Sequence, residues 1–355
     1  SIGYQAYGNP LLTHLTGLDN VTRIGGGLYI LNNDSILDLS GLDNVSFIGL
    51  DLVILMNTSL TSISELNKVT NIEGAIRIFG NSVLPGLNGL NAITTIGGEL
   101  FIQSNDSLTD LAGLDDIISV GAGINISYNY SLVDLTGINN LDSVGDYLLI
   151  EENNALENLT GMNSLTTIGG SLLIRKNNLL SNLSALENLT SIGGKLKIEH
   201  NNSLQSLAGL ENIAPGSISN LVLAYNSQLS TCEVMSICEY LADPNGDTEI
   251  HDNATGCNSP EEVEQACQTT GVRVYGTKPT LLIYPNPANK EINISIKRVY
   301  DLKRIIIYNR FGQKVFDEKN ITSNKIDVST LSPGIYVVEI DLHDLIFREK
   351  LIIEN

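Results

Sequence analysis

Four cysteines are the residues of this chain best suited to covalent or metal chemistry, and all lie between positions 232 and 267. An even, clustered set is typical of disulfides and of an exported protein. Zinc binding is the alternative, although intervals of 5, 18 and 9 intervening residues match no usual zinc spacing. We predict two disulfides among Cys232, Cys238, Cys257 and Cys267, and three pairings are open.

The remaining reactive side chains form no catalytic pattern. The four histidines are scattered without a fixed carboxylate or cysteine partner: His14, His200, His251 and His343. There is no phosphate loop, nucleophile elbow or HExxH motif, and no acidic column of the kind a β-helix polysaccharide-cleaving enzyme would need. Residues 243–247 (Asp-Pro-Asn-Gly-Asp) have glycine at the wrong place for a calcium loop. We expect no catalytic residue, no metal and no cofactor.

The charge distribution divides the 355 residues into two parts. Residues 1–278 carry 9 Lys/Arg against 30 Asp/Glu, whereas residues 279–355 carry 11 against 10. An acidic surface of this size repels phosphate backbones, so we expect no nucleic-acid partner. No apolar run approaches the roughly 18 residues that span a bilayer, so we expect no transmembrane segment.

A 24-residue repeat occupies most of the first part, and it must position whatever the chain presents. Each copy carries a Leu-x-Ile pair, an asparagine, two further apolar positions, a glycine, and Ile or Val before a second glycine. Short apolar alternations broken by Gly and Asn favour short strands and tight turns. Coils stacked about 4.8 Å apart would form a right-handed β-solenoid with a Leu/Ile core.

Two columns of the repeat have structural roles. An inward-facing amide can satisfy backbone groups that cannot reach water. We therefore predict a ladder of Asn33, Asn57, Asn81, Asn105, Asn129, Asn153, Asn177, Asn201 and Asn226. The glycine column suits turns with positive φ, although Glu65 and Ala185 at the same position indicate that a side chain is tolerated.

The variable, outward positions of the Leu-x-Ile strand are the candidates for binding. In the N-terminal half they form an apolar patch, and exposed apolar area of that extent usually marks an interaction surface. The candidates are Tyr29, Leu31, Val53, Leu55, Phe79, Phe101, Leu149 and Leu173. The alternative is that another segment covers the patch.

The first eight residues read as a partial coil with Tyr4 and Ala6 in strand positions and no capping element. An uncapped solenoid end exposes strand edges. We expect either that a preceding cap is missing or that this end docks on another subunit.

Downstream of the repeat the pattern changes twice. Val234, Ile237, Cys238 and Leu241 follow helical spacing, and a second helix is expected from Pro260 with Ser259 as its N-cap. From residue 281 seven short alternating stretches predict an Ig-like β-sandwich. We thus predict a mainly β chain with a solenoid (1–230), a helical disulfide-bonded cap (231–268), a linker (269–280) and a sandwich (281–355).

The repeat resembles leucine-rich repeats, and more closely the receptor L-domain type of β-solenoid. The resemblance rests on Leu-x-Ile-x-x-Asn-x-x-Leu-x-x-Leu, as in residues 196–207, and on Leu-Thr-x-Ile-Gly-Gly, as in residues 165–170. Two residues rather than one separate Asn from the next Leu, which favours an all-β coil over a helix-backed horseshoe. The resemblance implies a fold that presents a binding surface.

The last 75 residues resemble the type A C-terminal sorting domain of the type IX secretion system of Bacteroidetes. The matching motifs are Tyr-Pro-Asn-Pro-Ala at 284–288, Ile-Ile-Ile-Tyr-Asn-Arg-Phe-Gly-Gln-Lys at 305–314, Leu-Ser-Pro-Gly-Ile-Tyr-Val-Val at 331–338 and Lys-Leu-Ile-Ile at 350–353. The motif residues are Tyr284, Pro285, Asn286, Pro287, Gly334, Tyr336 and Lys350. The resemblance implies export through an outer-membrane translocon, delivery by a shuttle barrel and an extracellular or outer-surface location.

The same context implies three candidate O-glycosylation sites in Asp-Ser-apolar triplets, at Ser35, Ser107 and Ser143. Three functions follow as hypotheses. The first is a non-enzymatic cell-surface binding or adhesion protein with a protein or glycan ligand. The second is a self-assembling extracellular subunit that binds copies of itself. The third is a β-helix polysaccharide-active enzyme.

Overall fold

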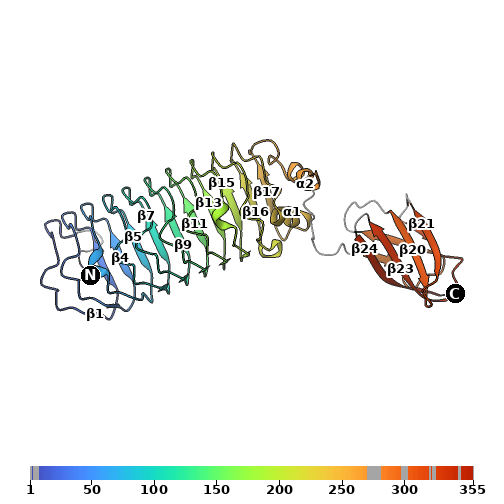
Figure 1. Cartoon of the computed structure of the whole chain (residues 1–355), viewed down its shortest axis with the longest axis horizontal. Coiled ribbons are helices and arrows are strands. Elements are labelled where there is room, and N and C mark those ends of the chain that lie inside the picture. The colour runs from blue at the N-terminus through green and yellow to red at the C-terminus, as the bar shows by residue number, and fades with distance from the viewer. Residues whose placement is uncertain are drawn as a thin grey trace. The chain divides into compact units, whose positions relative to one another are not determined.

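The computed structural model describes residues 2, 8–269, 281–296, 303–319, 321, 325–342 and 345–354. The chain divides into two compact units, residues 1–274 and 275–355, and each is described by itself (Figure 1). Of the expected linker at 269–280, only Thr269 belongs to the described residues. His343 lies outside them.

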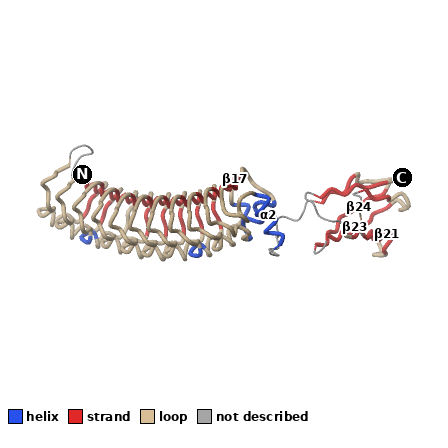
Figure 2. Tube along the Cα trace, turned by 90° about the horizontal axis from the view of Figure 1, so that it is seen from above, coloured by secondary structure: helices blue, strands red, loops and turns tan. Residues whose placement is uncertain are grey.

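The first unit is a β-solenoid whose main layer is a ten-stranded parallel sheet (Figures 1 and 2). Strands of successive coils pair in register, so that Leu52 lies opposite both Leu28 and Ile76. In order along the sheet the strands are β2 (Leu28–Leu31), β4 (Leu52–Leu55), β5 (Ile76–Phe79), β7 (Leu100–Gln103), β9 (Ile124–Ser127), β11 (Leu148–Glu151), β13 (Leu172–Arg175), β15 (Leu196–Glu199), β16 (Leu221–Ala224) and β17 (Thr248–His251).

A second row of two-residue strands runs along another side of the solenoid. It comprises β1 (Arg23–Ile24), β3 (Phe47–Ile48), β6 (Thr95–Ile96), β8 (Ser119–Val120), β10 (Ser143–Val144), β12 (Thr167–Ile168) and β14 (Ser191–Ile192). Ile72 bridges Ile48 and Ile96 and so joins the two sheets of this row. The Leu and Ile columns between the rows form one continuous core, with most members fully buried. The predicted mainly β solenoid is therefore confirmed.

The glycine column lies at turns where one coil touches the next. Gly161 has φ 112°, and a Cβ there would lie 2.0 Å from the carbonyl oxygen of Leu135. Glycine is required at such positions because both the backbone angle and the space exclude a side chain.

Glu65 and Ala185 occupy the same position with side chains, and the structure shows how the turn accommodates them. In these two coils the backbone changes to a 3₁₀ turn, η1 (Ser64–Leu66) and η2 (Ser184–Leu186), which appear as small blue turns in Figure 2. A third 3₁₀ turn, η3 (Pro215–Ser217), lies in the coil that has one extra residue, since 25 rather than 24 residues separate Asn201 from Asn226. A side chain is thus accepted only where the turn itself is rebuilt.

The asparagine ladder is continuous through the core. All nine predicted members are fully buried. Asn57 is typical: its Nδ2 donates to the carbonyl oxygens of Ile30 (3.0 Å) and Leu55 (3.1 Å), and its backbone N–H donates to Oδ1 of Asn81 (3.1 Å). The ladder amides satisfy backbone groups of the preceding coil, and all but Asn129 and Asn153 also donate to a carbonyl oxygen of their own coil. Buried turns require such partners.

The residue before each ladder asparagine has a left-handed backbone conformation. The sequence does not reveal this, because few of the residues at this position of the repeat are glycine. The φ values are 53–58° for the nine non-glycine members Asn32, Met56, Ser104, Tyr128, Glu152, Lys176, His200, Tyr225 and Asp252. This conformation costs about 1–2 kcal/mol per residue. The bond from Nδ2 of Asn57 to Leu55 spans Met56 and offsets that cost.

The N-terminal coil differs from the expectation. Tyr4 and Ala6 lie outside the described residues, and the residue paired with Ile30 is Ile2. Ile2 donates its N–H to the Tyr29 carbonyl oxygen at 2.7 Å and accepts from the N–H of Leu31 at 2.9 Å. The chain therefore reaches the sheet four residues earlier than the 24-residue period predicts.

The C-terminal end of the solenoid is closed by α1 (Met235–Ala242) and α2 (Pro260–Thr269), as expected. Ser259 Oγ accepts from the N–H of Glu262 at 3.3 Å, which is the predicted N-cap contact. Both disulfides are formed, Cys232 with Cys257 and Cys238 with Cys267.

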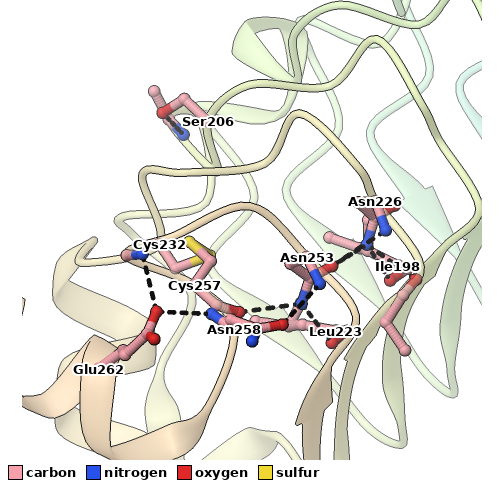
Figure 3. The surroundings of a disulfide bond; sticks show 12 residues. Ile198, Ser206, Leu223, Asn226, Cys232, Asn253, Cys257, Asn258 and Glu262 are labelled. Carbon is pink, nitrogen blue, oxygen red and sulfur yellow. Dashed lines mark hydrogen bonds between the residues drawn. A yellow bond between two sulfur atoms is a disulfide. The ribbon is translucent and has the colours of Figure 1, made fainter.

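The cap also contains a further coil between its two helices. The strand β17 pairs with β16, and Oδ1 of Asn253 accepts from the N–H of Asn226 at 3.0 Å (Figure 3). Nδ2 of Asn253 donates to Leu223 at 2.7 Å and to Cys257 at 3.0 Å. Asn253 therefore ends the ladder and links it to the Cys232–Cys257 disulfide.

The second unit consists of two antiparallel sheets around a separate core. One contains β18 (Leu281–Tyr284), β19 (Glu291–Ile296) and β22 (Lys325–Asp327). The other contains β20 (Arg304–Asn309), β21 (Lys314–Lys319), β23 (Gly334–Leu342) and β24 (Leu345–Ile353). All seven predicted strands are present, and the sandwich is confirmed.

Candidate binding face

The outward side of the ten-stranded sheet, called the sheet face here, is built from the second and fourth residues of each strand. These alternate with the inward Leu and Ile because successive side chains of a strand point to opposite faces. Residues at the same position of neighbouring coils lie opposite each other in the register, as Tyr29 does to Val53 and Val53 to Arg77. Variation along the chain thus becomes variation along the length of the solenoid.

The N-terminal half of the sheet face is apolar, but its side chains are half-buried rather than exposed. This holds for Tyr29, Leu31, Leu55, Phe79 and Phe101, and further along for Leu149 and Leu173. Phe79 and Phe101 meet edge to face with ring centroids 6.5 Å apart. Met56, in the adjacent left-handed column, is 41% exposed and extends the patch at its margin. The sequence reading missed Met56 because that column was not considered as a surface.

Val53 was predicted to be exposed with the other outward residues of the sheet face, and this prediction was wrong. It is only 7% exposed, because Tyr29 and Arg77 flank it on the neighbouring strands. Strands about 4.8 Å apart let large side chains cover a smaller one between them. Val53 therefore supports the patch and contributes little surface to it.

Two tyrosines at the rim of the sheet face donate to carboxylates. Tyr29 donates to Oδ2 of Asp51 at 3.1 Å, and Tyr147 donates to the carboxylate of Glu99, which also pairs with Arg77 at 3.3 Å. Burial, and then these hydrogen bonds, raise the pKa of both phenols. Both hydroxyls therefore remain protonated donors. Tyr147 could have been found from the sequence, since it precedes β11 at the position that Asp51 and Glu99 occupy in other coils.

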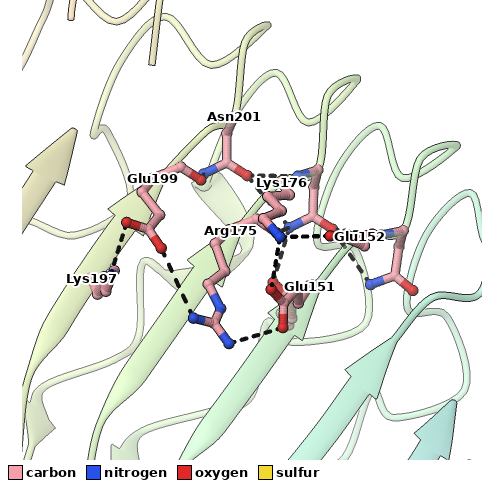
Figure 4. Close-up of polar contacts among 10 residues, drawn as sticks. Glu151, Glu152, Arg175, Lys176, Lys197, Glu199 and Asn201 are labelled. Carbon is pink, nitrogen blue, oxygen red and sulfur yellow. Dashed lines mark hydrogen bonds and ion pairs between the residues drawn. The ribbon is translucent and has the colours of Figure 1, made fainter. Parts of the chain in front are cut away.

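The C-terminal half of the sheet face carries a network of ion pairs (Figure 4). Arg175 contacts Glu151 at 2.9 Å and Glu199 at 3.9 Å. Lys197 pairs with Glu199 at 2.9 Å. Glu151 is 8% exposed, and its pairing with Arg175 offsets the cost of burying its side chain. The face therefore changes from apolar to charged along the solenoid.

Beyond the ion pairs, aromatic rings from successive coils form a row along the solenoid. The row corrects the prediction that the histidines are scattered without partners. His200 and Tyr225 stack with centroids 4.6 Å apart, and His251 meets Tyr225 edge-on at 5.1 Å. His251 also has a carboxylate partner, since its Nδ1 lies 2.8 Å from Oδ2 of Asp252. The spacing of about one coil between these residues is the signal that could have revealed the row. Across the described ranges, no three or more His, Cys, Asp or Glu side chains are grouped to hold a metal ion.

The motif residues of the second unit hold its first segment against its last strand. Nδ2 of Asn286 donates to the Lys350 carbonyl oxygen at 2.7 Å, and its Oδ1 accepts from Ile352 at 2.9 Å. Both Pro285 and Pro287 follow cis peptide bonds. Gly334 is the first residue of β23. Tyr336 is buried, and its hydroxyl donates to the Ser332 carbonyl oxygen at 2.6 Å. Tyr284 is 52% exposed. The structure thus brings Asn286 and Lys350 together across 64 residues of sequence.

Comparison with protein families agrees with both units. Residues 142–265 match the receptor L domain, and residues 282–354 match the secretion system C-terminal sorting domain. Both resemblances are confirmed. The receptor L domain match begins in the sixth coil and extends into α2, so it includes the cap. No curated protein matches the chain.

The sorting domain implies export by the type IX secretion system. Together with the two disulfides it indicates a secreted, extracellular or cell-surface protein. None of the helices in the described part of the chain has the length and apolar character that a membrane crossing requires. The receptor L domain suggests that the solenoid is a binding scaffold.

The three candidate O-glycosylation serines lie in different surroundings. Ser35 and Ser107 are half-buried in the turns after ladder asparagines, and Ser107 Oγ donates to the Ser82 carbonyl oxygen at 2.7 Å. Ser143 lies in β10, which pairs with strands on both sides. Modification at these serines remains a prediction.

Proposed function

We propose that this chain is a non-enzymatic cell-surface binding protein of the adhesion type, whose sheet face holds a protein partner. One observation carries the proposal: from Leu28 onward the repeated Leu, Ile and Asn columns are buried, while the residue types on the outward columns vary from coil to coil. An apolar half-buried surface next to a rim of ion pairs has the composition of a protein–protein interface.

Delivery is part of the same proposal. The sorting domain would bring the chain to an outer-membrane translocon and a shuttle barrel of the kind that Bacteroidetes use. The solenoid would then present its sheet face outside the cell.

The test uses the full chain immobilised on a sensor and exposed to a detergent extract of cell-surface proteins. We expect capture of a defined protein, which is then purified and shown to bind the chain directly. The double variant Phe79→Asp/Phe101→Asp should reduce that direct binding at least tenfold. Phe47→Asp is the matched control, since Phe47 lies in β3 on the other row of strands.

Binding that is equal in the sheet-face variant and the wild type would overturn the assignment of the face. Turnover in a polysaccharide-degradation screen would overturn the non-enzymatic assignment.

A self-assembling subunit is the second candidate, and the first coil favours it. Leu18 is 37% exposed, whereas Leu42, at the same position one coil later, is 1% exposed. Leu11 is 89% exposed. An end-to-end contact with a second copy would cover this end of the core. Size-exclusion chromatography with light scattering tests it, and a monomer at all concentrations would exclude this candidate.

A further inference from the structure

A polar groove runs along the C-terminal part of the solenoid, beside the sheet face and away from its apolar half. Its volume is about 350 Å³, and the residues lining it come from three successive coils: Glu152, Asn154, Lys176, Asn178, His200 and Asn202. They lie directly before and after the buried ladder residues Asn153, Asn177 and Asn201. The ladder therefore fixes the backbone on which both walls of the groove stand.

One wall is a row of exposed side-chain amides. Nδ2 of Asn202 donates to Oδ1 of Asn178 at 2.9 Å, and among the contacts of the described residues Asn154 has no hydrogen-bond partner. A carboxamide offers two donors and an acceptor side by side. Such a group can bond two adjacent hydroxyls at once, and the row repeats it at intervals of about 4.8 Å.

The lysine of the opposite wall is held in ion pairs. Nζ of Lys176 lies 2.7 Å from Glu152 and 3.7 Å from Glu151, and the hydrogen bond to Glu152 raises the pKa of the lysine. The solenoid around the groove is strongly acidic. A phosphate, sulfate or acidic polymer would be repelled, so the groove suits a neutral ligand.

Aromatic rings stand at both ends of the groove. His200 lines it and is stacked on Tyr225, with an angle of 5° between the ring planes, and Tyr225 is 45% exposed. Tyr130, one coil before Asn154 in the same column, is 47% exposed. A planar ring supplies an apolar platform with a polar edge. Rings combined with rows of amides match the two surfaces of a sugar, its C–H face and its hydroxyl edge.

We propose that this groove binds a neutral oligosaccharide that lies along the solenoid axis. One sugar ring packs against the exposed part of the His200–Tyr225 ring pair, and the hydroxyls of the next units bond the amides of Asn178 and Asn154. The site shares no residue with the apolar half of the sheet face, so it does not depend on a protein partner there.

The experiment is native affinity electrophoresis of the full chain in gels containing neutral polysaccharides: amylopectin, laminarin, xyloglucan, galactomannan or arabinoxylan. We expect at least one to retard the chain, and titration calorimetry with oligosaccharides of that polymer to give a measurable affinity. Tyr225→Ala, and separately the double variant Asn154→Ala/Asn178→Ala, should weaken the affinity at least tenfold. Tyr225→Phe should retain it, because the ring remains.

Asn88→Ala is the matched control, since Asn88 is an exposed amide of the solenoid that lies outside the groove. The variants alter exposed side chains, and thermal unfolding verifies that each is folded. Absence of retardation by all five polymers would overturn the proposal, as would retardation that Tyr225→Ala and the double Asn variant leave unchanged. Phe79→Asp/Phe101→Asp should retain oligosaccharide binding, which separates this proposal from the protein-binding one.

Discussion

Asn129 donates twice to a single oxygen, Oδ1 of Asn153 in the next coil, from its backbone N–H at 3.0 Å and from its own Nδ2 at 3.3 Å. Asn153 in turn donates to the Ile126 carbonyl oxygen at 2.9 Å. Each ladder amide thus bonds both neighbouring coils. Because repeat proteins are stabilised mainly by contacts between neighbours, this pair is a unit of the stability of the solenoid.

Replacing one ladder residue should therefore destabilise the fold strongly. Asn153→Ala leaves the N–H of Asn129 buried without a partner and removes the side-chain hydrogen bond to the Ile126 carbonyl oxygen. We expect a loss of about 3 kcal/mol in the free energy of unfolding. Urea unfolding measures it. Asn154→Ala, at the exposed adjacent position, should change stability by less than about 0.5 kcal/mol. Equal effects of the two variants would contradict the structural role of the ladder.

Two glycines of the same column allow the cost of backbone strain to be measured separately from the cost of steric crowding. Gly161 and Gly17 have similar φ values, 112° and 108°. A Cβ on Gly161 would lie 2.0 Å from the Leu135 carbonyl oxygen, whereas a Cβ on Gly17 would meet nothing within 4 Å. Both alanine variants carry the conformational strain, but only Gly161→Ala must also push two coils apart. We expect it to cost at least about 2 kcal/mol more than Gly17→Ala in thermal or urea unfolding.

The helix α2 should depend on its disulfide. Its buried residues are Val263 and Cys267 alone. In the variant Cys238→Ala/Cys267→Ala we expect the α2 amides to exchange hydrogen much faster, while those of β11 and β13 remain protected. Hydrogen–deuterium exchange measures this. Protection of α2 equal to that in the wild type would show that packing alone holds the helix.

Acid should weaken the second unit through Asp317. The hydrogen bond from Arg304, assisted by Lys314, lowers the pKa of Asp317 from 3.8 to about 2. Because the folded-state pKa is depressed, the stabilisation is present above the unfolded value and is lost as pH falls from about 4 to about 2. NMR titration of the Asp317 carboxyl in the full chain tests the value. Arg304→Gln should raise this pKa toward 3.8, whereas Arg348→Gln, which removes a pair with Glu339, should not.

The 24-residue period by itself determines the scaffold. Leu196 and Ile198 must face inward and Lys197 outward because strand side chains alternate, and Asn201 must be buried because only an amide satisfies the turn beneath it. The seven strands of the sorting domain and the helical cap follow from equally local patterns. These features depend on residues within a single coil or motif, so a linear reading finds them.

The tertiary structure alone decides what lies between coils. Val53 is buried because the large side chains of Tyr29 and Arg77 flank it. The turn around Ala185 is rebuilt because the neighbouring coil leaves no space for its Cβ in the usual turn. Insertion of α1 breaks the period, which hides Asn253 as the last ladder residue and sets the cysteine pairing. The stacking of His200 on Tyr225 also depends on two coils meeting. Such contacts are made across the repeat, through side-chain volume and stacking distance, and no single copy of the repeat encodes them.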